Sequence, residues 1–196
     1  QDVKRTILCS VRKFDNDIQE IIKEYKAFVV NEKTLLPVKI IYKNPENLGV
    51  DRIANVVAAS IIYSAKNVLV FDFGSCLTVD FIKSSNKYIG GRISPGLKMR
   101  YKSLHYFTDK LPLCDVTLED NYIGNDTISS IICGVQRGMV DEVSSIINTF
   151  IKENNSTVVV FTGGDCFFFE KAVKNTIFAD PFLVLKGLNE ILDYNE

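Results

Sequence analysis

The chain has 196 residues, of which 46% are hydrophobic and 24% charged, and its formal net charge is −1. This length suits one sizeable domain or two small lobes with a real core, and the balanced charge argues against nucleic acid as a partner. The apolar runs are too short to span a bilayer and no secretory signal follows the first residues, so we expect a cytoplasmic protein without membrane contact.

The cysteine and histidine content restricts the chemistry. The five cysteines form no Cys-x-x-Cys pair, and each lies in an apolar or strand-like segment, so we expect reduced, buried thiols. A single histidine, His105, leaves little room for a His-based metal site or a catalytic triad. The cysteines are Cys9, Cys76, Cys114, Cys133 and Cys166.

Short strands and two helices are predicted for the first third of the chain. The strands are expected over residues 3–11, 28–30 and 37–42, and the helices over 15–27 and 51–64. Asn44-Pro45 and Gly49 predict a turn region before the second helix. The first helix would place four apolar side chains on one face. These are Ile18, Ile21, Ile22 and Tyr25.

The rest of the chain predicts strands that alternate with helices. Strands are expected over residues 67–73, 77–83, from Lys87 into Gly90-Gly91, and over 157–165. Helices are expected from about Gly96 to Phe107, over 127–153 and 165–174, and from Pro181 through Asp193. Hairpin strands followed by this alternation indicate an α/β protein with a mixed sheet.

The stretch DFGSCLT, residues 72–78, places a carboxylate, a glycine and two hydroxyls between two apolar strands. A tight turn exposes backbone N–H groups, and the hydroxyls of Ser75 and Thr78 can donate to phosphate oxygens. Asp72 can hold a cation beside those phosphates. Taken alone, the stretch is better explained by an ordinary hairpin whose polar residues satisfy its turn.

The stretch GGRISPGLK, residues 90–98, nearly matches a phosphate-binding loop. Its lysine comes one place late and no Ser or Thr follows, which excludes a Walker-type nucleotide site. The glycines still predict a loop that a ligand or another backbone approaches closely.

Two further motifs carry chemistry at element ends. In LGVDR, Asp51 can act as a general base, and Arg52 can hold a carboxylate by two parallel hydrogen bonds. Their alternative is an acidic residue that serves the helix dipole beside a solvated arginine. In TGGD, Gly163 and Gly164 permit close approach of a base or phosphates, or they form a plain turn with Asp165 capping a helix.

Taken together and in this order, the motifs YKNPENLGVDRIAN, DFGSCLTVDFI, YIGGRISPGL and FTGGD resemble type III pantothenate kinase, a bacterial family of the actin-like superfamily. GNDT, 124–127, and DPFLVLKGL, 180–188, fit its later segments. The resemblance implies an actin-like (ribonuclease H-like), two-lobed α/β fold with mixed sheets flanked by helices. The lobes would be residues 1–66 and 67–196.

The resemblance also implies an activity. The family transfers the γ-phosphate of ATP to pantothenate, giving 4′-phosphopantothenate in the first step of coenzyme A synthesis. It needs Mg²⁺ and a monovalent cation, K⁺ or NH₄⁺, and it works as a homodimer with its sites at the subunit boundary.

Residue by residue, the resemblance makes Asp51 the catalytic base and Asp72 the ligand of the monovalent cation. The expected pantothenate-binding residues are Tyr42, Gly49, Val50, Asp51, Arg52 and Thr127. The expected ATP-binding residues are Ser75, which replaces the family's usual threonine, and Gly163 and Gly164.

The family's Asp-x-Gly-Asn-Thr phosphate loop has no counterpart in this sequence, so the first lobe is expected to be incomplete. The alternative function is therefore a non-catalytic ligand-binding or regulatory relative of the family.

Helix 127–153 carries a continuous apolar stripe, which predicts either a core element or a surface at a homodimer interface. The resemblance favours the interface. The stripe comprises Ile128, Ile131, Ile132, Val135, Met139, Val143, Ile146, Ile147 and Phe150.

Overall fold

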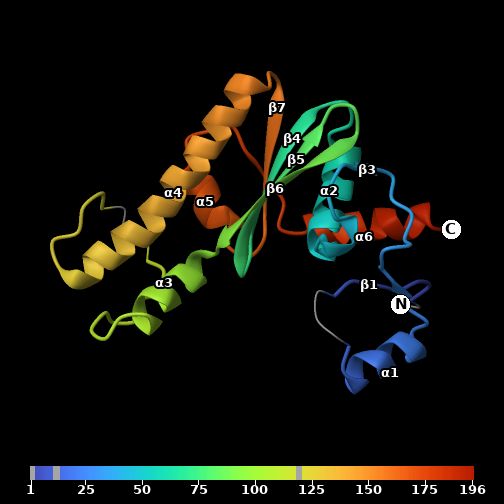
Figure 1. Ribbon diagram of the computed structural model, residues 1–196, viewed down its shortest axis with the longest axis horizontal. Helices are drawn as coiled ribbons and strands as arrows, with labels where there is room; N and C mark the ends of the chain where they lie inside the picture. Colours follow the sequence, from blue (N-terminus) through green and yellow to red (C-terminus); the bar gives the residue numbers. More distant parts are fainter. Residues whose placement is uncertain (1–2, 11–13, 118–120) are drawn as a thin grey trace. The chain divides into compact units, whose positions relative to one another are not determined.

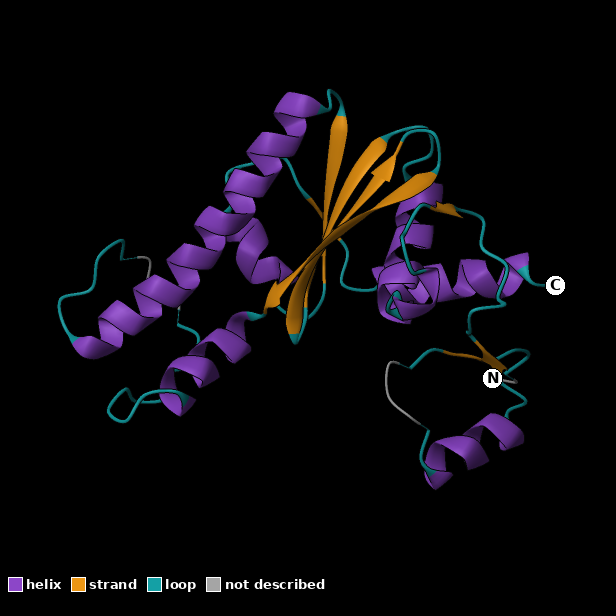
Figure 2. Ribbon diagram, viewed as in Figure 1, coloured by secondary structure: helices purple, strands orange, loops and turns teal. Residues whose placement is uncertain are grey.

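The computed structural model describes residues 3–10, 14–117 and 121–196. It divides into two compact units, shown with their helices and strands in Figures 1 and 2. Unit 1 contains Gln1–Val68, Asp80–Gly90 and Phe182–Glu196, and unit 2 contains Leu69–Val79 and Gly91–Pro181. The lobe boundary expected between residues 66 and 67 stays a prediction.

Unit 1 is built from short parallel strand pairs and helices. Strand β1 pairs in parallel with β2, and β3 pairs in parallel with β6 at Lys87 and Tyr88. Its elements are β1 (Ile7–Leu8), α1 (Asn16–Glu24), β2 (Phe28–Val29), β3 (Lys39–Ile40), the 3₁₀ helix η1 (Pro45–Asn47), α2 (Val50–Ile62) and α6 (Leu183–Tyr194).

Helices α2 and α6 form the packed centre of unit 1. A Cβ atom on Gly187 of α6 would lie 1.8 Å from the carbonyl oxygen of Ala54 in α2, so the two backbones touch where α6 has no side chain. Alanines and valines of α2 are fully buried there, which lets the helices approach closely.

Helix α1 confirms the helix predicted near residues 15–27, and Asp15 caps it by accepting a hydrogen bond from the backbone N–H of Ile18. Its apolar face is only partly covered in the described chain. Ile18 and Ile22 are half-buried, whereas Ile21 and Tyr25 are exposed.

Unit 2 combines the sheet's central strands with three helices. Unit 2 contains residues 69–73 of β4, 76–79 of β5 and 91–95 of β6, and its strand order is β6-β5-β4-β7-β8. Only two residues join β4 to β5, which makes this pair an antiparallel hairpin, whereas β7 and β8 pair in parallel. The elements are β4 (Asn67–Phe73), β5 (Cys76–Lys83), β6 (Lys87–Pro95), α3 (Leu97–Tyr106), α4 (Thr127–Glu153), β7 (Thr157–Thr162), α5 (Cys166–Ala172) and β8 (Phe178–Ala179).

The core of unit 2 is a buried cluster of aromatic rings. Phe73 of β4 stacks on Phe169 of α5 with ring centroids 4.3 Å apart, and it meets Phe161 of β7 edge-on at 4.7 Å. Offset stacks and edge contacts are the arrangements that aromatic pairs prefer. The cluster packs the ends of β4 and β7 against α5.

Helix α4 lies beside α3 (Figure 1) and begins with a capping box between Asp126 and Ser129. Most of its predicted apolar stripe is buried within unit 2, so the core interpretation holds for those positions. They are Ile131, Ile132, Val135, Met139, Val143, Ile146 and Ile147. At the helix start, Ile128 is 54% exposed.

The α/β class with a mixed sheet is confirmed, and most predicted elements lie within a few residues of their expected places. The strand expected over 3–11 is only Ile7–Leu8 among the described residues (residue 11 lies outside them), and β8 was not predicted. All five cysteines are free thiols, but only Cys166 is fully buried. Among the described helices, none is long and apolar enough to cross a membrane.

Candidate functional site

The residues predicted to form the site divide between the two units. Unit 1 holds Tyr42, Gly49, Val50, Asp51 and Arg52, and unit 2 holds Asp72, Ser75, Thr127, Gly163 and Gly164.

Asp51 presents its carboxylate at the surface of unit 1, in the first turn of α2. Its Oδ1 accepts a hydrogen bond from the backbone N–H of Arg52 at 2.8 Å. A Cβ atom on Gly49 would lie 2.5 Å from this oxygen, so the glycine leaves room for the carboxylate.

Arg52, by contrast, is buried and paired. Its Nε donates to Oδ1 of Asp80 at 3.0 Å, and its Nη2 donates to the same carboxylate and to the hydroxyl of Tyr88. Arg52 is 5% exposed and Asp80 is 1% exposed. The interpretation of Arg52 as a solvated side chain is therefore wrong. Arg52 makes its parallel hydrogen bonds to a carboxylate with Asp80, inside the protein.

Tyr88 completes this buried cluster. Its hydroxyl donates to Oδ1 of Asp80 at 2.8 Å, and its ring stacks on the ring of Tyr42 with centroids 6.0 Å apart. Neither Asp80 nor Tyr88 was predicted as part of the site. A carboxylate within the apolar run TVDFI was the available signal, because such a charge is rarely buried without a partner.

The protonation states of the cluster follow from burial and charge. Burial alone would lower the pKa of Arg52, but hydrogen bonds and charge from Asp80 outweigh it and raise the pKa, so the guanidinium stays protonated. Burial, with the charge of Asp80, raises the pKa of Tyr88, which keeps its hydroxyl a donor. Nearby, burial and then the charge of Asp51 raise the pKa of the Cys9 thiol.

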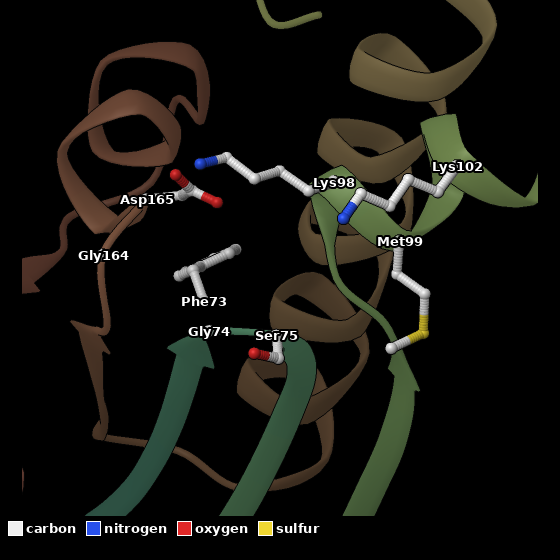
Figure 3. A pocket seen from close by; sticks show the side chains of 8 residues that line it. All are labelled: Phe73, Gly74, Ser75, Lys98, Met99, Lys102, Gly164 and Asp165. Carbon is white, nitrogen blue, oxygen red and sulfur yellow. The ribbon is translucent and has the colours of Figure 1, made fainter. Parts of the chain in front are cut away.

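In unit 2 a cavity of about 410 Å³ opens at the turn between β4 and β5 (Figure 3). Ser75 and Gly164, two of the predicted ATP-binding residues, both line it. The lining comprises Phe73, Gly74, Ser75, Lys98, Met99, Lys102, Gly164 and Asp165.

Glycine backbones hold this turn on two sides. A Cβ atom on Gly96 would lie 2.4 Å from the carbonyl oxygen of Gly74, and the N–H of Gly96 donates to the carbonyl of Ser75 at 3.2 Å. The close approach predicted for the Gly-rich stretch is thus made, at Gly96, by another backbone. Gly163 has a φ of 87°, and a Cβ there would lie 2.5 Å from Oδ1 of Asp72.

The cavity contains charged side chains that sequence reasoning missed. Lys98 and Lys102 stand one helical turn apart on α3, and Lys98 extends across the cavity toward Asp165 (Figure 3). Asp165 occupies the N-cap position of α5, but its side chain makes no capping hydrogen bond. The alternative in which the Asp165 side chain caps the helix is therefore wrong, and the carboxylate lines the cavity instead.

Oxygen atoms suited to a hard cation lie on the strands around Asp72. Asp72 is the last residue but one of β4 and is half-buried, and β5 and β7 are the neighbours of β4 in the sheet. Within the described chain the buried hydroxyl oxygens of Thr78, on β5, and Thr162, on β7, have no hydrogen-bond partner. Buried polar atoms without partners are unusual, and hydroxyl and carboxylate oxygens are ligands that hard cations accept.

Thr127 is the first residue of α4 and is exposed. Large apolar side chains are exposed around it and at the end of α3. They are Tyr106, Phe107, Tyr122, Ile123 and Ile128.

Known proteins are similar to this chain in sequence and in fold. The family model described as type III pantothenate kinase matches residues 1–149. A type III pantothenate kinase from Phocaeicola vulgatus is 44% identical over 196 residues, 99% of this chain and 81% of the relative. One from Christiangramia forsetii is 40% identical, covering 99% of this chain and 80% of the relative. A Campylobacter jejuni crystal structure, assigned to the Baf family of transcriptional activators, matches with a TM-score of 0.65 and 26% identity over 100% of this chain and 85% of that one.

The buried cluster predicts a stability effect for Tyr88→Phe. The substitution keeps the ring but leaves Asp80 and Arg52 each without one hydrogen bond, which should lower the free energy of unfolding by about 1–3 kcal/mol. Urea unfolding measures this loss, with Tyr194→Phe at an exposed position as the control. Equal stability of the two variants would contradict the role of the Tyr88 hydroxyl.

Proposed function

The chain belongs to the type III pantothenate kinase family, and we propose that it transfers the γ-phosphate of ATP to the primary hydroxyl of pantothenate, the first step of coenzyme A synthesis. The observation that carries this proposal is 44% identity to a type III pantothenate kinase over 99% of the chain. On the same basis we expect the two-lobed actin-like fold and a cytoplasmic location.

Asp51 acts as the general base. Its exposed carboxylate at the start of α2 supports this role, because it can meet a bound hydroxyl directly. It takes the proton of the pantothenate hydroxyl while that oxygen forms a bond to the γ-phosphorus. The bond from the γ-phosphorus to the bridging oxygen breaks, and ADP leaves with the electron pair.

Tyr42, Gly49, Val50, Arg52 and Thr127 bind pantothenate in this proposal. The internal pairing of Arg52 changes how it does so. Asp80 and Tyr88 occupy its Nε and Nη2, and the guanidinium also hydrogen-bonds the side chain of Tyr42. Arg52 therefore acts on the pantothenate carboxylate through its charge, and it positions Tyr42 and the helix start that carries Asp51.

ATP lies in the cavity of unit 2, with Ser75, Gly163 and Gly164 as its contacts. The hydroxyl of Ser75 and the open backbone at Gly164, which line one cavity, support this placement. Phosphoryl transfer requires mainly positioning and neutralisation of charge, and neither a histidine nor a cysteine nucleophile is needed.

Mg²⁺ and a monovalent cation, K⁺ or NH₄⁺, complete the site. Mg²⁺ would be held mainly by the phosphates of ATP and by water. Asp72 would hold the monovalent cation, and Thr78 and Thr162, on the two strands that neighbour β4, have hydroxyls without a hydrogen-bond partner among the described residues. The cations supply positive charge beside the phosphates.

A regulatory relative without catalysis is the second candidate. The structural match to a Campylobacter jejuni protein assigned to the Baf family of transcriptional activators favours it. Pantothenate-dependent release of ADP from ATP, assayed on the intact protein, separates the two functions, because the regulatory relative would show none.

Asp51→Asn should lower kcat by about 10²–10⁴-fold, since it removes the proton acceptor while preserving the shape of the side chain. Steady-state kinetics on the intact protein measure this loss. Glu46→Gln, at an exposed carboxylate on η1, is the matched control and should leave kcat unchanged. A kcat near normal in Asp51→Asn would remove Asp51 from the role of base.

The cation site predicts that K⁺ or NH₄⁺ activates the enzyme. Replacing them by a bulky organic cation at constant ionic strength should reduce kcat/KM for ATP roughly tenfold, the effect of one lost charge interaction of about 1.4 kcal/mol. Asp72→Asn should abolish this response. Identical kinetics with all the cations would rule out the assignment of Asp72.

A two-fold symmetric homodimer completes the proposal, with the pantothenate site at the subunit boundary. Because most of the α4 stripe is buried within unit 2, the exposed apolar side chains around Thr127 and the end of α3 are the surface proposed for the contact. An obligate contact buries about 2,000 Å² or more. Light scattering at micromolar concentration should give twice the monomer mass for the intact protein. Ile123→Asp, which places a charge in the proposed contact, should reduce the measured mass. A monomer mass for the intact protein would rule out a site shared between subunits.

A further inference from the structure

We infer that Lys98 and Lys102 of α3 hold the phosphate chain of the nucleotide. This inference rests on the proposed function and assigns a role to two side chains that the family resemblance did not single out. Both line the cavity that also contains Ser75 and Gly164 (Figure 3).

The position of the two lysines is set by the backbone. Gly96 immediately precedes α3, and its close contact with the carbonyls of Gly74 and Ser75 ties the start of the helix to the β4–β5 turn. Lys98 follows only two residues later, so it must lie next to that turn. A side chain at position 96 would collide with the turn and move the lysine away.

Buried residues set the rotation of the helix. Leu97 and Tyr101 are 1% and 2% exposed, and the hydroxyl of Tyr101 donates to Oε1 of Gln136 in α4 at 2.9 Å. Lys98 and Lys102 each follow one of these buried residues directly and are likewise four residues apart, so they lie on a neighbouring face of the helix. The two lysines therefore share one face, and that face lines the cavity.

Helix stability does not explain these lysines. Lys98 lies in the first turn of α3, where the helix dipole disfavours a positive charge, and the first turn contains no acidic residue. Like charges four residues apart also repel. Within the described chain, neither lysine makes an ion pair within the 4.0 Å expected of one. An anion between them would relieve both unfavourable interactions.

The chemistry of the cavity matches a polyphosphate. It contains two ammonium groups, each with three donors, and a single carboxylate, that of Asp165. The hydroxyl of Ser75 adds a further donor at its base (Figure 3). Lysine binds phosphate as a point charge, so two lysines one helical turn apart can contact successive phosphates of one chain.

The test compares Lys98→Gln and Lys102→Gln with Lys110→Gln, an exposed lysine outside the cavity that controls for lost charge. For each cavity variant we expect KM for ATP to rise about tenfold to a hundredfold, the range for hydrogen bonds to charged groups, with KM for pantothenate unchanged. Lys98→Arg and Lys102→Arg, which keep the charge, should recover most of the affinity. Thermal unfolding verifies that the variants remain folded.

Calorimetric binding of inorganic tripolyphosphate to the intact protein gives a second readout that does not depend on catalysis. Its affinity should fall in both Gln variants and not in Lys110→Gln. Weaker ATP binding with unchanged tripolyphosphate binding would place the lysines against the nucleoside and overturn the inference. Unchanged binding of both ligands by the Gln variants would also overturn it. So would a lack of tripolyphosphate binding by the unaltered protein. If the unaltered protein does not phosphorylate pantothenate but its tripolyphosphate binding depends on the lysines, the proposed function fails and the phosphate contact stands.

Discussion

The turn at Gly74 and Ser75 is held against neighbouring backbone at Gly96, with no space for a side chain between them. Just after the end of β7, Gly163 approaches Phe73 and Asp72 about as closely. The contacts of Gly96 with the turn and of Gly163 with Phe73 are made by main-chain atoms, so they place the turn, the start of α3 and the end of β7 within narrow limits. Ser75, Lys98 and Gly164 share one cavity because of them. A rigid cavity suits phosphoryl transfer, in which positioning supplies much of the catalysis.

Unit 1 achieves similar rigidity by different means. Its buried cluster links α2 to two strands through Arg52, Asp80 and Tyr88. Removing one partner of such an ion pair leaves an uncompensated charge, whereas an intact, fully bonded pair sets one geometry. The adjacent Asp51 remains exposed. At the start of α2, Arg52 thus points into the interior and has a structural role, whereas the neighbouring Asp51 faces solvent and can react.

The two units present different chemistry to their ligands. The candidate nucleotide cavity in unit 2 contains lysines, a hydroxyl and open backbone, which suit a charged chain of phosphates. The residues proposed for pantothenate in unit 1 combine a carboxylate, a buried guanidinium and a half-buried tyrosine, Tyr42, which suit a small ligand with both hydroxyl and carboxylate groups.

The sequence by itself determined the family, the order of the elements and even the bounds of β4 and α4, because strand and helix periodicity are properties of a single segment. It also identified Ser75 and Gly164, which lie in one cavity. Only the tertiary structure decided that Arg52 is paired with Asp80, that most of the α4 stripe is buried, and that Lys98 and Lys102 line the cavity. Each of these depends on segments far apart in the chain meeting in space, and a local pattern contains no information about which partner will cover a given face.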